Sequence, residues 1–210
     1  MALIPVSKTS VVVLALARIR DLAPESIVLA GVALSALFTA ATAMLQYFAE
    51  DTQVAAVVFW TFGSLRRVTY NELAVMALVT AATYAFFHVN RWNCNALESG
   101  EGSAHSLGVN VKGLRLVGML VGTLAASTII AFCGTINFIG LVAPHIMRRI
   151  IGNDYRYLFP ASAFAGACLM LASDLAASTV AAPVVLPISA VTSFIGAPLF
   201  LYLLIERKSR

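Results

Sequence analysis

Long apolar stretches separated by short polar segments dominate the chain. Five of them are long enough to cross a bilayer, since about 20 residues at 1.5 Å per residue cover its apolar core of about 30 Å. We predict spanning helices at residues 26–48, 72–89, 114–133, 161–180 and 188–205. Pro24 and Glu25 directly precede the first span, an arrangement typical of a helix start.

Two further segments are too short or too polar to span. Residues 50–70 hold the apolar run VAAVVFWTF between two acids and the pair Arg66 and Arg67. We expect this run to form a helix that lies at the membrane interface or dips partly into it. Residues 90–113 are the longest hydrophilic stretch, and their glycines and serines predict short helices and turns. A second polar connection is predicted at residues 152–160.

Residues 134–149, GTINFIGLVAPHIMRR, are apolar but irregular. Gly134, Gly140 and Pro144 are expected to break the helix, and His145 and two arginines follow. In lipid a broken backbone is tolerated only where protein buries it or where it lines a cavity, because each unpaired amide costs several kcal/mol. The stretch therefore predicts a pathway region inside a polytopic protein.

The lysines and arginines fix an expected orientation, because short cytoplasmic loops are rich in both. If residues 134–149 cross once, the chain crosses six times and only Arg66 and Arg67 fall outside. The C-terminus is then cytoplasmic, on the same side as Lys8, Arg18, Arg20, Arg91, Lys112, Arg115, Arg148, Arg149, Arg156, Arg207, Lys208 and Arg210.

Composition agrees with a membrane protein. The chain is 60% hydrophobic and 11% charged, with a mean hydropathy of +0.88, whereas soluble domains are about 25% charged. The net charge of +4 comes from scattered basic residues, which argues against nucleic-acid binding. The three cysteines have no metal or redox spacing and are expected to be packing residues.

Five motifs in order resemble the FecCD-type permeases, the membrane subunits of ABC importers for iron-siderophores, haem and cobalamin. They are VLAGVALS at 28–35, FWTFGSL at 59–65, NAL with AHSLGVNV up to 111, GTINFIGLVAPHIMRRIIGNDYRYLFP at 134–160, and LPISAVTSFIGAPLFLYLL at 186–204.

The resemblance implies an all-α polytopic membrane protein with the type II ABC importer permease fold. It implies about six crossing helices, short interfacial and coupling helices, and one transmembrane permease domain over residues 1–210. The expected assembly is a homodimer in the cytoplasmic membrane, with two ATPase subunits and an external substrate-binding protein.

Family members have about ten spans, so four are expected to be missing here, and the run at 11–17 is expected to be a remnant of the fourth. A truncated non-transporting paralogue or gene fragment stays open as an alternative. A secondary transporter is less favoured. Such a protein is expected to show inverted repeats and intramembrane charge pairs, whereas only one acid, Asp174, lies deep in a long span here.

By the resemblance, the polar segment from Leu97 to Val111 forms two short coupling helices that dock into a groove of the ATPase subunit. A glycine provides a tight turn, and an exposed leucine provides an apolar anchor. An ordinary solvated loop is the alternative. A histidine stands where the family commonly has an arginine. The candidate residues are Leu97, Glu101, Ala104, His105, Leu107, Gly108 and Val109.

The resemblance makes the permease a transporter and not an enzyme. The sequence has no GxxxxGK[ST] motif, so ATP is expected to bind to the partner subunit, and no cofactor is expected on this chain.

Two ionisable residues lie within apolar segments. His145 is a metal ligand or proton relay, or else a helix-end packing or hydrogen-bonding residue; the second is favoured and no metal site is expected, because no further ligand stands at suitable spacing. Asp174 is the only acid deep in a long span, and it contacts either substrate or, as we favour, a neighbouring helix.

Arg66 and Arg67 have two open interpretations. They dock the external binding protein, or they anchor the chain at the interface by snorkelling. Ser178 and Val185 stand where many family members carry an arginine and a glutamate, which weakens the expected docking site of the binding protein.

Overall fold

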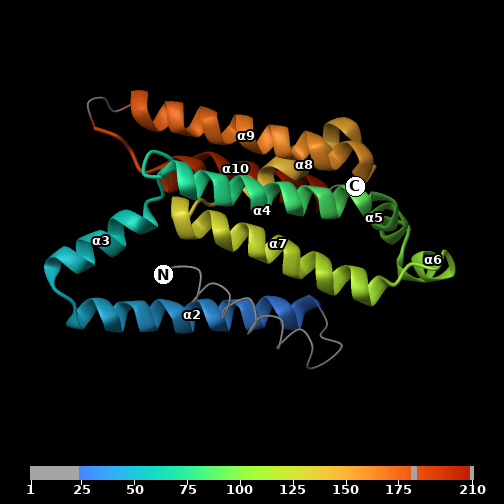
Figure 1. Ribbon diagram of the computed structural model, residues 1–210, viewed down its shortest axis with the longest axis horizontal. Helices are drawn as coiled ribbons and strands as arrows, with labels where there is room; N and C mark the ends of the chain where they lie inside the picture. The colour runs from blue at the N-terminus through green and yellow to red at the C-terminus, as the bar shows by residue number, and fades with distance from the viewer. Residues whose placement is uncertain (1–23, 181–183, 209–210) are drawn as a thin grey trace.

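The computed structural model describes residues 24–180 and 184–208, and the helices in these residues are joined by turns without any strand (Figure 1). The apolar run at 11–17 lies outside the described residues. The helices are α2 (Pro24–Phe48), α3 (Asp51–Thr61), α4 (Tyr70–Val89), α5 (Arg91–Glu98), α6 (Glu101–Ser106), α7 (Val111–Cys133), α8 (Ile139–Ile151), α9 (Tyr155–Thr179) and α10 (Ile188–Lys208).

Four long helices and one shorter helix form a bundle. α8 packs most extensively against α9, α4 packs against α7 and α9, and α10 packs against α9 and α8. α2 runs roughly parallel to this bundle, and α3 joins it to the start of α4 (Figure 1). Many apolar side chains face outward, such as Met44 and Leu45 on α2. Large exposed apolar surfaces of this kind are typical of chains that contact lipid or further protein.

The described residues contain four helical segments long and apolar enough to cross a membrane. They are Gly31–Phe48, Tyr70–Val89, Val111–Cys133 and Tyr155–Thr179. The fifth expected span corresponds to α10, whose helix has 21 residues and whose shorter apolar part is Ile188–Tyr202. Four of the five predicted long spans therefore correspond to helices with the length and hydropathy that a membrane crossing requires.

The predicted polar connection at 152–160 is wrong beyond Asp154, where α9 already begins. Asp154 is the N-cap of α9, and its carboxylate accepts a hydrogen bond from the Arg156 amide at 2.9 Å. Pro160 lies inside this helix near its start. In a similar way α7 begins at Val111, three residues before the predicted start. Asn110 is its N-cap, and the Asn110 side chain accepts a hydrogen bond from the Gly113 amide at 2.9 Å.

Only one of the three predicted helix breaks between 134 and 149 exists. Gly134 ends α7 with a φ of 78°, and Phe138 precedes α8 with a left-handed φ of 66°. α8 then continues through Gly140 and Pro144, so the breaks predicted at these two residues are wrong. Pro144 removes one amide hydrogen bond, and the remaining bonds and the packing of α8 on α9 hold the helix together.

The helices alternate in direction, so the connections gather at two ends (Figure 1). At one end the turn after α3 meets the turn after α7, where the Ser64 amide donates to the Cys133 carbonyl at 2.8 Å. The start of α10 joins them, because the Ser189 amide donates to the Phe62 carbonyl at 3.2 Å. The opposite end carries α5, α6 and the α8–α9 turn.

Candidate functional site

The predicted coupling segment begins where α4 turns into α5. Asn90 caps α4, since its side-chain Nδ2 donates to the Phe86 carbonyl at 2.9 Å. The Asn90 carbonyl in turn accepts from the Cys94 amide at 2.9 Å inside α5. One residue thus ends the long helix and starts the short one.

Two glycines shape α6. Gly100 has a φ of 105° and joins α5 to α6, and Gly108 has a φ of 79° just after α6. The Val109 amide donates to the Ala104 carbonyl at 3.0 Å and closes this second turn. Positive φ is readily available only to glycine. Gly108 was predicted to form the turn between the two short helices, but Gly100 occupies that position and Gly108 forms the turn between α6 and α7. The short helices are Arg91–Glu98 and Glu101–Ser106, so Leu97 belongs to the first helix, which starts earlier than predicted.

The candidate coupling residues present different surfaces. Ala104 is fully buried, whereas Leu107 is 70% exposed at the end of α6. Glu101 forms an ion pair with Arg115 on α7. A hollow of about 430 Å³ lies beside Leu107 and is lined by Glu101, His105, Gly108, Val109, Asn110, Val111 and Lys112. An exposed leucine next to a hollow with both acidic and basic groups provides chemistry for contact with another protein surface.

The remaining candidates lie elsewhere and are not brought together. Arg66 and Arg67 are exposed at the opposite end, where the Arg67 guanidinium lies 5.9 Å from the centroid of the Phe59 ring. His145 is exposed on α8, and Asp174 is partly exposed near the C-terminal end of α9. No cluster of three or more metal-ligating side chains occurs among the described residues.

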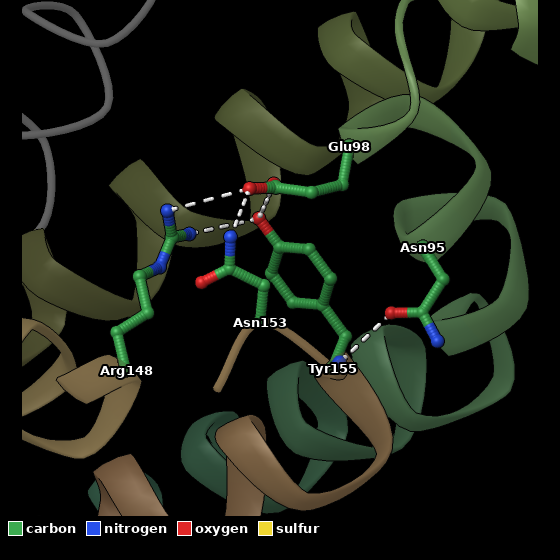
Figure 2. A network of polar contacts seen from close by, with 5 residues as sticks. All are labelled: Asn95, Glu98, Arg148, Asn153 and Tyr155. Atoms are coloured by element: carbon green, nitrogen blue, oxygen red, sulfur yellow. Dashed lines mark hydrogen bonds and ion pairs between the residues drawn. The ribbon is translucent and has the colours of Figure 1, made fainter. Parts of the chain in front are cut away.

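A polar network that the sequence did not reveal lies next to α5 (Figure 2). Glu98 accepts from Asn153 Nδ2 at 2.8 Å and from the Tyr155 hydroxyl at 3.3 Å, and it lies 3.8 Å from the Arg148 guanidinium. Asn95 accepts from the Tyr155 amide at 2.8 Å. The network therefore joins α5 to the end of α8 and the start of α9.

Asp154 extends this network. Its Oδ1 accepts from Asn95 Nδ2 at 2.8 Å and from the Arg156 amide at 2.9 Å. These hydrogen bonds, above all the one from Asn95, lower the pKa of Asp154, and the nearby charges of Arg156 and Arg91 act in the same direction. Asp154 is therefore ionised throughout the physiological pH range.

The sequence offered only part of the evidence for this network. Asp154 ahead of an apolar run is a readable N-cap signal. Asn95 and Glu98, however, lie 55 to 60 residues from their hydrogen-bond partners. No local spacing rule connects positions so far apart.

The family of the chain follows from comparison with known proteins. The sequence description of the FecCD transport family matches residues 1–206. This chain belongs to the FecCD transport family. The predicted family, a family of transport permeases, is confirmed, and with it a membrane location.

Curated relatives of the FecCD chain are ABC permeases. An ABC transporter permease of Methanocaldococcus jannaschii is 53% identical over 95% of this chain and 57% of its own length. The haemin transport permease HmuU of Yersinia pestis is 36% identical over 88% of this chain and 55% of its own. The vitamin B12 import permease BtuC of Vibrio vulnificus is 32% identical over 94% and 59%. The chain thus spans somewhat more than half the length of these relatives.

A solved structure confirms the predicted fold class of this FecCD chain. It is described as a metal-chelate type ABC transporter in an inward-facing conformation, and it matches with a TM-score of 0.83 and 30% sequence identity. The match covers 95% of this chain and 64% of that one.

Proposed function

We propose that this chain is part of the membrane permease of an ABC importer for an iron chelate, haem or cobalamin, driven by ATP hydrolysis on a separate subunit. The observation that carries the proposal is the α5–α6 segment at one end of the bundle (Figure 1), with Leu107 exposed at the C-terminal end of α6. Relatives named for haemin, iron hydroxamate and vitamin B12 support these three substrate classes.

In this proposal the permease performs no chemistry. Closure of the ATPase dimer pushes on Leu97, Glu101, Ala104, His105, Leu107, Gly108 and Val109, which we call the coupling residues. The transport pathway has two conformations, and this push shifts the equilibrium between them. A partner can shift such an equilibrium only if it contacts the two conformations differently. The turn at Gly134 and helix α8, with Gly140, Pro144 and His145, form part of the pathway wall.

The remaining partners belong to the same proposal. A second permease copy completes the pathway, and an external binding protein docks at the opposite end through Arg66 and Arg67. Asp174, near that end of α9, contacts a neighbouring helix of the complete assembly. The positive-inside pattern supports a cytoplasmic location for α5, α6 and the C-terminus.

Association with the ATPase tests the proposal. Leu107→Ala removes this exposed apolar side chain. Apolar side chains that become buried at the centre of an interface can each increase the affinity about tenfold or more. We expect the ATPase subunit to bind the complete permease about tenfold more weakly in this variant. Asn93→Ala is the matched control, because Asn93 is exposed on α5 and its side-chain Nδ2 donates to the nearby Asn90 Oδ1 at 3.1 Å. Equal affinity of Leu107→Ala and the control would argue against docking through Leu107.

A further inference from the structure

Asn95 and Glu98 place two polar side chains on one face of α5. Residues three apart on a helix are neighbours on its surface. Their partners come from the end of α8 and the start of α9, and Figure 2 shows both side chains directed at this turn. The face of α5 that carries them is thus fixed to another part of the chain.

Asn95 supplies part of the N-terminus of α9. The first amides of a helix have no partner within the helix. The Asp154 carboxylate accepts from the Arg156 amide, and Asn95 Oδ1 accepts from the Tyr155 amide at 2.8 Å. Asn95 Nδ2 also donates to Asp154 at 2.8 Å. If α5 moved away alone, an amide at the start of α9 would lose its acceptor.

Glu98 holds the end of α8 in the same arrangement. Its carboxylate accepts from Asn153 and Tyr155, and Arg148 on the last turn of α8 faces it at 3.8 Å. Arg148 also donates to the Tyr155 hydroxyl at 3.0 Å. The two ends of the α8–α9 turn are thus both joined to one side chain of α5.

Aromatic contacts strengthen the connection and extend it into the bundle. The Arg156 guanidinium lies 4.8 Å from the centroid of the Trp92 ring on α5. The Tyr155 ring lies 5.0 Å from the Phe159 ring, which lies 5.3 Å from the Phe87 ring on α4. Arginine–aromatic and aromatic pairs of this geometry are attractive.

The link from α6 to the bundle is weaker by comparison. Glu101 and Arg115 form an ion pair, but their side chains are 65% and 56% exposed. Exposed ion pairs contribute little to stability, because water and salt screen them. The hydrogen bonds of the half-buried Asn95 are therefore the stronger attachment of the segment.

We propose that Asn95 and Glu98 are positioning residues that fasten the α5–α6 segment to the α8–α9 turn. A displacement of the segment by the ATPase then moves the end of α8 and the start of α9 with it. Since α8 follows the turn at Gly134, the displacement reaches the pathway wall. This inference rests on the proposed function, because it requires an ATPase partner.

The variant Asn95→Ala in the complete permease, assembled with its ATPase subunits in liposomes, tests the inference. The readout is backbone hydrogen exchange of residues 149–158, with and without ATP, using an ATPase that binds but does not hydrolyse ATP. A coupling free energy between two sites typically changes an equilibrium constant about fivefold or more. We expect the ATP-dependent change in exchange to fall about fivefold, while the ATPase still co-purifies.

Asn93→Ala is again the matched control, since it removes an asparagine side chain from the same helix whose partner, Asn90, is local at 3.1 Å. It should retain the ATP-dependent change of the unmodified protein. A merely structural role of Asn95 would alter exchange equally with and without ATP. An undiminished ATP response in Asn95→Ala, or none in the unmodified protein, would overturn the inference.

If the Asn95→Ala permease does not assemble with the ATPase, the variant Glu98→Gln tests the inference instead. Glutamine keeps an acceptor for Asn153 and removes the charge that faces Arg148. A smaller ATP response at residues 149–158 supports the inference, and an unchanged response overturns it. An ATPase that fails to bind the unmodified permease would instead contradict the proposed function.

Discussion

A glycine pair holds together the two turns at the end opposite α5 and α6, and replacing one of them gives a sharp prediction. Gly134 has φ 78° and ψ −172°, a region that side-chain-bearing residues almost never occupy. A Cβ built on Gly134 would collide with the Trp60 carbonyl oxygen and lie 2.9 Å from the Gly63 Cα. Gly63 also has a positive φ of 68°.

The magnitude of Gly134→Ala follows from these two effects. A residue forced into such a backbone conformation costs about 1–3 kcal/mol, and a rigid overlap in a packed region costs about another 1–3 kcal/mol. We therefore expect Gly134→Ala to lower the free energy of unfolding by about 2–6 kcal/mol. In a chain of this size that corresponds to a fall in Tm of about 4 °C or more.

Gly140→Ala is the matched control for this measurement. Gly140 lies in the first turn of α8, and a Cβ added there meets no atom within 4 Å. In the middle of a helix alanine is more favourable than glycine by about 0.5–1 kcal/mol, and this value is an upper limit in the first turn, so the variant should be neutral or slightly more stable. Thermal unfolding of both variants in detergent micelles compares them. Equal Tm values for Gly134→Ala and Gly140→Ala would refute the close crossing of the two turns.

Three further predictions concern the two ends of the bundle. Ala104→Leu should lower the free energy of unfolding by about 1–3 kcal/mol, because Ala104 is fully buried, whereas Leu107→Ala should leave the Tm unchanged. An unchanged Tm for Ala104→Leu would contradict the packing of α6. Reversing Arg66 and Arg67 to glutamate should slow association with the binding protein about tenfold at low salt, with rescue by the opposite reversal on the partner; no rescue favours interfacial anchoring. The lowered pKa of Asp154 means that its stabilising charge is fully present above its unfolded pKa of about 4 and is lost as pH falls through the lower folded value. The Tm difference between the unmodified protein and Asp154→Asn should therefore shrink on acidification from pH 7 to about 3, and a constant difference would contradict the role of the charge.

The sequence predicts the spans well because a spanning helix is specified by length and hydrophobicity alone. α4 and α7 were recognisable on these grounds, within three residues at their starts. Local glycine and serine content predicted short helices and turns in the polar segment, and the family resemblance implied that there are two such helices, which the structure has at 91–98 and 101–106.

What the sequence did not predict depends on contacts between distant segments. Pro144 and Gly140 looked like helix breaks, yet the packing of α8 against α9 outweighs their local preference. The span containing α9 was predicted to start at Ala161, whereas the cap at Asp154 starts the helix at Tyr155. The bonds of Asn95 join positions 59 and 60 residues apart and become visible only in the folded chain.

The proposed transport function is tested most directly by uptake into vesicles. The complete permease is reconstituted in liposomes with ATP inside, and uptake of labelled ferric hydroxamate, haemin and cobalamin is measured in parallel. We predict uptake of at least one of the three, and only when the ATPase subunit and the external binding protein are both present. Uptake of any of these compounds without either partner would contradict an ATP-driven importer.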